Sequence, residues 1–379
     1  MIKSIYATSD NTIYEKTGSL NSGIDSILEL AKISSSAGIF TSRILIKFDL
    51  DAVSSSIAAG DITDPKFYLN LYSTNVKETP LAYALAAYPV SQSWQNGVGR
   101  MLEPIRQNGY IHDGSSWIYR DKKDLTSTYV ATKDTQWTSE SLATGTAMKY
   151  SSVTGGGTWY TNYYGTESFD HETTDLRMDV TPVINYILQT TASKSAPGTF
   201  INDGIILMRS GSQETDAVAY GNIQFFSRET NTVYQPRLEI VYDDSSFDTT
   251  GLTELTSDEG VVYVKNLKHE YSTKEKPKIR VVGRDRYPTK TFSTESNYKT
   301  IKFLPTSSYY AIKDALTEEF IVPFSSAGTK LSCDTSGNFF KLDMNSFMPE
   351  RYYKLAFQVT QSDASVVVYD ENFYFKVVK

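Results

Sequence analysis

Short runs in which apolar and polar residues alternate recur along the chain. Residues 43–49, 67–72 and 237–242 alternate in this way, and residues 204–209 form a continuous apolar run. A period of two directs one face of a strand to a core and the other to water or a second layer, whereas a continuous apolar run is typical of a central strand. Residues 24–31 suit either element, and we predict a strand because they follow a turn-forming Asn-Ser-Gly sequence.

Two segments carry helical signals. Thr181 can cap a helix, Pro182 suits the first helical turn, and the apolar residues within 183–188 form one stripe. A shorter helix is predicted from 51 to 59, where Gly60 can end it. Helices are therefore a minor part of the expected fold.

The composition favours sheets. The chain has 379 residues, which leaves room for more than one domain, and its 40% hydrophobic and 21% charged residues are ordinary for folded proteins. Aromatic residues make up 13%, led by 27 Tyr and 18 Phe, and such residues suit pleated surfaces. We predict an all-β protein with an N-terminal jelly-roll-like β-sandwich that includes a short helix, and a C-terminal immunoglobulin-like β-sandwich.

The boundary between the two sandwiches is predicted at an acidic stretch. Residues 243–260 carry six acidic residues and no basic one, with turn formers throughout. We therefore assign 1–243 to the first sandwich, 244–260 to a linker and 261–379 to the second sandwich. The last segment is close in length to an immunoglobulin-like domain, which has about 100 residues.

Charge is segregated along the chain. The net charge of −7 disfavours whole-molecule attraction to nucleic acid or to an anionic membrane. The stretch after the linker is nevertheless basic, with nine Lys or Arg against three acidic residues. A solvated sheet face is the ordinary explanation, and docking to an acidic protein neighbour is the functional one. The candidate contact residues are Lys265, Lys268, Lys274, Lys276, Lys278, Arg280, Arg284, Arg286 and Lys290.

Cysteine usage and apolar runs indicate where the protein folds. The single cysteine, Cys333, cannot form an internal disulfide, which suits assembly in a reducing cytosol. The first residues lack the apolar stretch of about 7–15 residues that an export signal needs. No run approaches the roughly 18 apolar residues of a membrane span. We expect neither export nor membrane insertion.

The sequence contains no recognisable catalytic motif. The three histidines, His112, His171 and His269, lack the spacing of a metal-binding helix or finger. Gly155-Gly156-Gly157 does not lead into a Lys-Ser or Lys-Thr helix, so a flexible turn is favoured over a phosphate loop. Cys333 is expected to be a small buried residue. We predict no catalytic, cofactor-binding or metal-binding residues.

Two groups of oxygen-bearing side chains could nevertheless hold a structural Ca²⁺. Carboxylate and amide oxygens are its usual ligands, although an acidic surface turn is the more ordinary explanation. The groups are Asp10, Asn11 and Asp49, and Asp170, His171, Glu172 and Asp175.

All four tryptophans lie between residues 91 and 175, a region also rich in Tyr and Gly. Aromatic faces can cover a protein or a sugar at small entropic cost, so these residues are candidate surface aromatics. The ordinary alternative is that they fill the core beneath long loops. The residues are Trp94, Trp117, Trp137 and Trp159, with Tyr119, Tyr160, Tyr163 and Tyr164 beside them in the sequence.

The segment before the linker resembles the DNRLRE family of β-sandwich domains, which look like carbohydrate-binding modules. The likeness rests on an ordered series of stretches and does not extend to about residues 91–175. It implies a first strand, a core strand, a helical turn and a closing hairpin, as in surface and virion-type proteins. The matching stretches are ATSDNTIYE at 7–15, NSG at 21–23, SRILIKFDL at 42–50, DVTPV at 179–183, FFSRE at 225–229 and PRLEI at 236–240.

The C-terminal segment resembles immunoglobulin-like or fibronectin-like modules of phage structural proteins. The sequence FMPERYY at 347–353 is similar to the turn before a late sandwich strand, and it places Tyr353 to form a tyrosine corner. Tyr352 takes that place if the register shifts by one. Residues 304–314 and 369–377 are also similar to segments of tailed-phage virion proteins, especially those of T4-like marine phages.

These observations lead to one expected function and one alternative. We expect a non-enzymatic structural component of a tailed-bacteriophage virion, a capsid decoration or a neck or tail accessory protein, assembled in the host cytoplasm. Its partners would be other virion proteins and copies of itself. The alternative is an adhesin that binds host surface polysaccharide through the aromatic loops. A polysaccharide-degrading enzyme is disfavoured because no sequence spacing establishes a pair of facing carboxylates.

Overall fold

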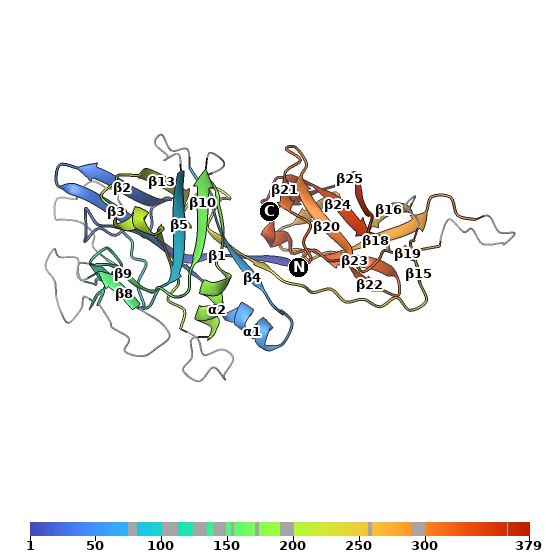
Figure 1. Cartoon of the computed structure of the whole chain (residues 1–379), viewed down its shortest axis with the longest axis horizontal. Coiled ribbons are helices and arrows are strands. Elements are labelled where there is room, and N and C mark those ends of the chain that lie inside the picture. The colour runs from blue at the N-terminus through green and yellow to red at the C-terminus, as the bar shows by residue number, and fades with distance from the viewer. Residues whose placement is uncertain are drawn as a thin grey trace. The chain divides into compact units, whose positions relative to one another are not determined.

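The computed structural model describes residues 1–74, 82–100, 113–123, 135–138, 149–152, 155–170, 174–189, 201–256, 260–289, 300–361 and 363–379. The described chain is mostly strand, which confirms the all-β prediction (Figure 1). It divides into two compact units. The N-terminal unit comprises Ile5–Ala58 and Lys66–Glu239, and the C-terminal unit comprises Met1–Ser4, Ala59–Pro65 and Ile240–Lys379.

The N-terminal unit is built around one large antiparallel sheet. Along its main path the strands follow the order β10-β5-β12-β3-β1-β14-β4-β11, and β2 connects β3 to β13. In the described residues, β6–β7 and β8–β9 form two further two-stranded sheets, and β9 is bridged to the residues after β5 through Val90 and Trp159. The strands are β1 (Ile2–Tyr14), β2 (Ile27–Ser35), β3 (Gly38–Phe48), β4 (Lys66–Leu71), β5 (Ala82–Pro89), β6 (Tyr119–Asp121), β7 (Thr135–Gln136), β8 (Lys149–Ser152), β9 (Gly155–Tyr160), β10 (Gly165–Asp170), β11 (Leu176–Asp179), β12 (Ile205–Arg209), β13 (Gly221–Phe226) and β14 (Arg237–Val241).

The large sheet nearly closes on itself. Its two end strands, β10 and β11, lie next to each other, and the Arg177 N–H donates a hydrogen bond to Glu167 Oε2 at 3.1 Å. Gly165 lies so close to the Asp179 carbonyl that an added Cβ would be 2.2 Å from its oxygen. Because the sheet nearly closes, most of its strands have a neighbour on both sides. Where β10 meets β11 the backbones come so close that residue 165 has to be a glycine.

Among the described residues of this unit, three helices connect the strands: α1 (Asp51–Ala58), α2 (Thr181–Gln189) and α3 (Ser212–Thr215). The helices predicted near residues 51 and 181 are confirmed, and the strand predicted over 24–31 is confirmed from Ile27, where β2 begins. The helix-capping role of Thr181 is not as predicted. Its hydroxyl accepts a hydrogen bond from Phe67 N, whereas Asp179 Oδ1 accepts from Thr181 N.

The C-terminal unit is a sandwich of two sheets. One has the order β15-β19-β18-β23-β22, with β16 also paired to β18, and the other has the order β17-β25-β24-β20-β21. The strands are β15 (Thr253–Glu254), β16 (Gly260–Lys265), β17 (Glu270–Ser272), β18 (Lys278–Asp285), β19 (Lys302–Phe303), β20 (Ser308–Asp314), β21 (Phe320–Val322), β22 (Ser332–Asp334), β23 (Gly337–Lys341), β24 (Tyr352–Thr360) and β25 (Val366–Val378), with a 3₁₀ turn at Met344–Ser346.

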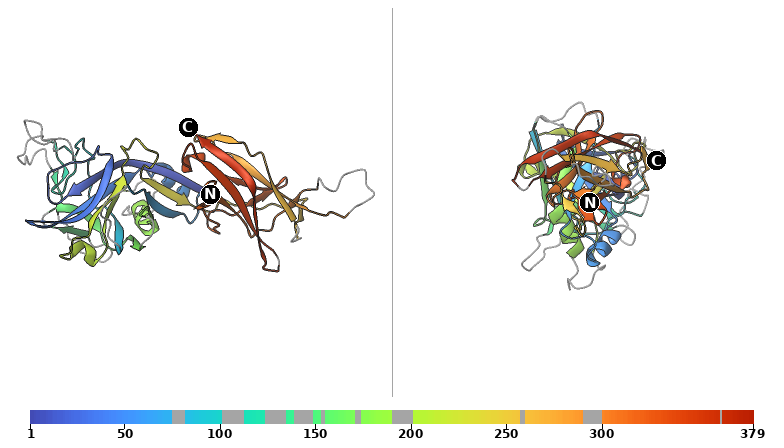
Figure 2. Two further views of the ribbon diagram at one scale, coloured as in Figure 1. Left: turned by 90° about the horizontal axis from the view of Figure 1, so that it is seen from above. Right: turned by 90° about the vertical axis from the view of Figure 1, so that its right-hand side faces the viewer.

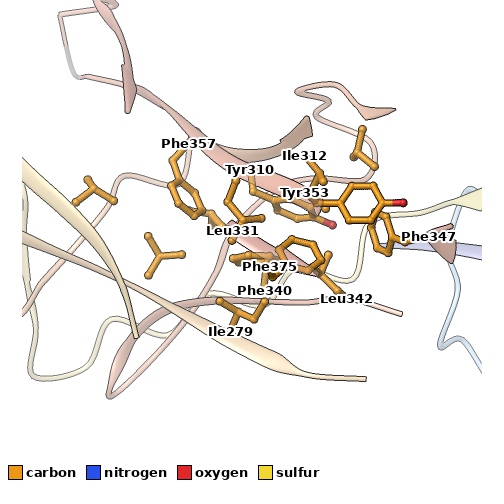
Figure 3. Close-up of a cluster of buried hydrophobic side chains, with 14 of the residues drawn as sticks. Ile279, Tyr310, Ile312, Leu331, Phe340, Leu342, Phe347, Tyr353, Phe357 and Phe375 are labelled. Atoms are coloured by element: carbon orange, nitrogen blue, oxygen red, sulfur yellow. The ribbon is translucent and has the colours of Figure 1, made fainter. Parts of the chain in front are cut away.

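Aromatic rings dominate the core between these two sheets. Figure 3 shows Tyr353 beside Phe347, and their ring centroids are 5.2 Å apart. Tyr353 also stacks on Phe375 of β25 at 5.5 Å, while Tyr310 of β20 stacks on Phe340 of β23 at 4.4 Å. Tilted and offset ring contacts of this kind stabilise a core beyond the area that they bury.

The segment predicted to be an acidic linker contributes to the C-terminal unit. Phe247 forms an isolated β-bridge with Cys333, and Thr253–Glu254 pair with Lys302–Phe303 in a parallel ladder. Leu255 is fully buried in the core of this unit. The acidic residues of this segment are thus interspersed with residues that pair or pack within the C-terminal unit.

Tyr353 has the geometry expected of a tyrosine corner. Its ring is buried, and its hydroxyl donates a hydrogen bond to the Met348 carbonyl oxygen at 3.0 Å, five residues upstream. The neighbouring Tyr352 is exposed and lies over the outer face, near Lys376. The hydroxyl of Tyr353 therefore fixes the turn that leads into β24.

We predict that Tyr353→Phe lowers the free energy of unfolding by about 1 kcal/mol, because the Met348 carbonyl loses its buried donor. The change is measured as a shift in the denaturant midpoint of the full chain. Tyr352→Phe is the matched control, and we expect it to change the midpoint little. An equal cost for the two substitutions would contradict this role for Tyr353.

Candidate functional site

The basic stretch of the sequence lies on, between and after β16, β17 and β18, and four of its nine members form ion pairs within the chain. Lys268 contacts Glu275 at 2.9 Å, and Lys276 contacts Asp343 at 3.1 Å. Lys278 and Arg280 both contact Asp334, at 2.8 and 2.7 Å. Within the described part of the chain, the members that form no ion pair are Lys265, Lys274, Arg284 and Arg286, while Lys290 lies outside the described residues.

Asp334 is the strongest acidic partner of this stretch. Arg280 donates to both of its carboxylate oxygens, at 2.7 and 2.9 Å. These hydrogen bonds, together with one from Lys278, hold the pKa of Asp334 well below its usual range, although burial opposes the shift. A two-point contact of this kind is a fixed part of the fold, so Arg280 and Lys278 are poor candidates for docking another molecule.

The five-stranded sheet of the C-terminal unit presents a different surface. Large apolar side chains are exposed to solvent on the outer face of this sheet and along the side formed by β25. Val366 and Val368 are 55% and 52% exposed, and Tyr374 on the same strand is 39% exposed. Core-facing residues of the same strand, such as Phe375, are fully buried. We name residues 366–374 the β25 edge (Figure 1).

Lysines and carboxylates form a compact network beside the β25 edge. Asp370 accepts from Lys313 at 2.6 Å and lies 2.9 Å from Lys354 Nζ. Burial opposes the ionisation of Asp370, but the hydrogen bonds from the two lysines outweigh it and lower its pKa. Glu318 contacts the same lysines at 3.5 and 3.1 Å. The charges on this face therefore largely neutralise one another.

The four tryptophans are buried, which agrees with the alternative that they fill the core and not with a surface platform. Trp94, Trp117, Trp137 and Trp159 are each 4–6% exposed, and they pack into one cluster with apolar residues of β1, β3 and β12. Two indole N–H groups donate inward, from Trp94 to the Asp203 carbonyl at 2.7 Å and from Trp137 to the Ser116 carbonyl at 2.9 Å. Sugar stacking needs an exposed ring face, which these residues do not offer.

Arg43, from the stretch that resembles a DNRLRE core strand, lies among these rings. Its guanidinium carbon is 4.7 Å from the centroid of Trp117 and 4.9 Å from that of Trp159. Its Nε donates to Glu214 Oε1 at 2.8 Å, and Nη1 donates to the Gly156 carbonyl. Gly156 has a φ of 87°, and an added Cβ would lie 2.3 Å from Arg43. The three-glycine segment is thus part of β9, in contact with Arg43, and is not the flexible turn predicted.

A group of tyrosines, unlike the tryptophans, reaches the surface of the N-terminal unit. Tyr163 stacks on Tyr186 of α2 at 4.1 Å, and Tyr160 contacts the same ring at 4.8 Å. Tyr164 is 52% exposed and lies 6.0 Å from Tyr88. We name these five residues the tyrosine cluster. Tyr119, by contrast, is buried.

The first candidate cation group does not converge. Asn11 donates to the Ser115 carbonyl and hydroxyl at 2.8 and 2.7 Å, and Asp49 is exposed, where it accepts from the Asp51 N–H. Asp10 accepts from the Arg228 N–H at 2.6 Å. Burial raises the pKa of Asp10 to about 7, even though this hydrogen bond lowers it. The three side chains thus serve separate local contacts.

The remaining candidate metal-binding and catalytic residues do not come together within the described chain. Asp170 and Asp175 are exposed, and His171 and Glu172 lie outside the described residues. Over the part of the chain that is described, no group of three or more His, Cys, Asp or Glu could hold a metal ion. His112 is also outside that part, whereas His269 is exposed. Cys333 is buried as predicted, and burial raises the pKa of its thiol to about 11.

Comparisons with known proteins show no family. No protein-family model matches the chain, and no curated protein matches it. A solved structure of a DUF4785 family protein from Legionella pneumophila matches with a TM-score of 0.19 and 7% identity. The match covers 100% of this chain and 62% of that one, and a TM-score this low carries no argument. Among the described helices, none is long and apolar enough to cross a membrane.

The arrangement around Arg43 predicts a large effect of Arg43→Met. The substitution leaves the buried Glu214 carboxylate without its closest partner, at an expected cost of about 3–5 kcal/mol in unfolding free energy. The double variant Arg43→Met/Glu214→Gln removes the uncompensated charge, so it should be more stable than Arg43→Met alone. Denaturant unfolding of wild type, Arg43→Met, Glu214→Gln and the double variant measures the coupling. Additive effects would contradict a direct ion pair.

The raised pKa of Asp10 predicts a pH-dependent stability. Because the folded pKa of about 7 exceeds the ordinary value of 3.8, the folded protein binds a proton that the unfolded chain releases. The contribution of Asp10 to the unfolding free energy therefore falls as pH rises from about 4 to 7. Asp10→Asn should remove this decline of the unfolding free energy. Asp49→Asn, which removes an exposed carboxylate, should leave the decline unchanged. Parallel pH profiles for wild type and Asp10→Asn would contradict the assignment.

Proposed function

We propose that the protein is a non-enzymatic structural component of a tailed-bacteriophage virion that acts through protein–protein contacts. The protein would serve as a capsid decoration protein or as an accessory protein of the neck or tail. The resemblances to DNRLRE domains and to phage modules support this proposal from the sequence. From the structure, the main support is the β25 edge, where Val366 and Val368 remain more than half exposed on a long sheet strand.

Exposed apolar side chains on a strand edge are suited to assembly. Such an edge combines unsatisfied backbone hydrogen-bonding groups with apolar surface, and another chain can cover both at once. When many copies are held on a symmetric particle, contacts that are individually weak add up. The dense aromatic core behind β25 keeps the strand in place without help from a partner.

We propose the C-terminal unit as the end that anchors the protein to its particle. The contact would use the cations that form no ion pair within the described chain and are exposed: Lys265, Lys274 and Arg286. An acidic neighbour would complement them, and this contact would weaken as salt concentration rises. They are three of the nine candidates suggested by the sequence: Lys268, Lys276, Lys278 and Arg280 are paired internally, Arg284 is half-buried, and Lys290 lies outside the described residues.

A glycan-binding adhesin is the second candidate, and the tyrosine cluster is the observation that favours it. Tyr164 presents an exposed ring, and Tyr160, Tyr163 and Tyr186 form contiguous aromatic surface next to α2. An exposed ring such as that of Tyr164 can stack on a sugar, and the half-buried rings of Tyr160, Tyr163 and Tyr186 could offer hydroxyls at the rim for hydrogen bonds. The candidate surface is thus formed by tyrosines and not by the tryptophans.

Two measurements distinguish these functions. For a structural component, mass spectrometry of purified phage particles should find the protein in many copies per particle, and a glycan array probed with the purified protein should show no binding. For an adhesin, the array should show binding that Tyr164→Ala removes and Tyr119→Phe retains. Absence of the protein from purified particles would contradict the proposed function.

A further inference from the structure

The backbone of β25 presents hydrogen-bonding groups on two sides, and one side is mostly uncovered. Val377 N donates to the Arg351 carbonyl at 3.2 Å, so the backbone groups of Val377 face the β24 side. Lys376 N donates to the His269 carbonyl at 2.8 Å, so Lys376 faces the opposite side, where β17 lies. Strand β17 pairs only with Lys376–Val378. Beyond that point, the described chain provides no further strand on this side of β25.

The register shows which residues face the uncovered side. Backbone groups of successive strand residues point to alternate sides. The register with β24 shifts between Leu355 and Phe357. Beyond that shift, Gln361 N donates to the Ser365 carbonyl at 2.9 Å and Val367 pairs with Val359, so the odd-numbered residues of this part of β25 again face β24. The N–H and C=O groups of Val366 and Val368 therefore point away from the sheet. Their side chains are exposed as well, so within the described residues neither the outward backbone groups nor the side chains of these two valines have a partner.

We propose that the β25 edge binds the same edge of a second copy of this chain, in an antiparallel pair with a two-fold axis at Val367. This inference deepens the proposed function and rests on it for the biological setting. The axis places Val366 of each copy opposite Val368 of the other. The two strands then exchange hydrogen bonds, and four exposed valines become one covered apolar cluster.

Charge on the strand also fits a second copy as the partner. Residues 364–369 carry no charged side chain, so the centre of the pair holds none. Asp370, which follows, would lie opposite Ala364 of the other copy. The Asp370 carboxylate is already held by Lys313 and Lys354 at 2.6 and 2.9 Å. It therefore adds little uncompensated negative charge where the two identical edges meet. The pair joins two five-stranded sheets into one continuous sheet.

Sedimentation velocity of the purified full chain over a range of concentrations tests the pairing. Wild type should show a reversible monomer–dimer equilibrium, because only a short strand segment is paired. Val368→Lys places a charge on the edge, and Val368→Pro removes the outward N–H without touching the bonds to β24, so each should abolish the dimer. Val218→Lys is the matched control, since Val218 is 50% exposed in the other unit, and it should dimerise like wild type.

Cysteine cross-linking tests the register. A mixture of Val366→Cys and Val368→Cys chains should form a mixed disulfide more efficiently than either variant alone, because only the mixture places two cysteines directly opposite. Cys333 is buried and should not contribute. Monomeric wild type at every concentration, or equal cross-linking of the mixture and of a Val218→Cys control, would overturn the inference.

The outcomes separate this inference from the proposed function. A protein that is abundant on particles but monomeric in solution, with particle binding unaffected by Val368→Lys, would contradict the β25 pair and leave the virion role standing. A β25-dependent dimer that is absent from particles would contradict the virion role and leave the pair standing.

Discussion

Hydrogen bonding between strands is the constraint on which both units depend. A strand leaves one row of N–H and C=O groups for each neighbour, and an uncovered row invites another chain. The N-terminal unit meets this constraint by almost closing its sheet, with Glu167 and Gly165 at the seam between β10 and β11. The C-terminal unit has two open sheets, and along the β25 edge the described part of the chain covers neither the outward backbone groups nor the apolar side chains. The proposed contacts follow from that difference.

The aromatic residues act mainly as internal structure. In the N-terminal unit, four buried tryptophans belong to one cluster, and the flat guanidinium of Arg43 lies against two of them, Trp117 and Trp159, while Glu214 matches its charge. In the C-terminal unit, Tyr353 and Phe375 stack at the centre of the core. Planar cations and rings pack closely, so they give each unit a fixed shape without disulfides. A fixed shape is what allows an exposed edge to be presented reliably to a neighbour.

Local pattern predicted the elements well, because strand alternation and helix starts depend on neighbouring residues. The helix at Thr181, the strand that includes residues 27–31 and the turn before Tyr353 are examples, since each is decided within about ten residues of sequence. Exposure was harder to predict. Whether Trp94 or Trp159 faces water depends on loops and strands far away in sequence, and the structure buries both.

Ion pairing and unpaired strand edges were hard to predict for the same reason, because both depend on residues far apart in the sequence. The basic stretch looked like a single surface, but Asp334 and Asp343 come from more than 50 residues further along the chain and neutralise part of it. The β25 edge was not predicted because strand order is a property of the whole fold. The Val-Val-Val sequence at 366–368 was the available signal, since three adjacent valines cannot all face one core.

The most direct test of an assembly role for the β25 edge is residue-resolved amide hydrogen exchange of the full chain at low and high protein concentration. The account predicts that the amides of Val366 and Val368 exchange more slowly as concentration rises, while that of Val367, already facing β24, changes little. Exchange of Val366 and Val368 that stays fast and independent of concentration would contradict it.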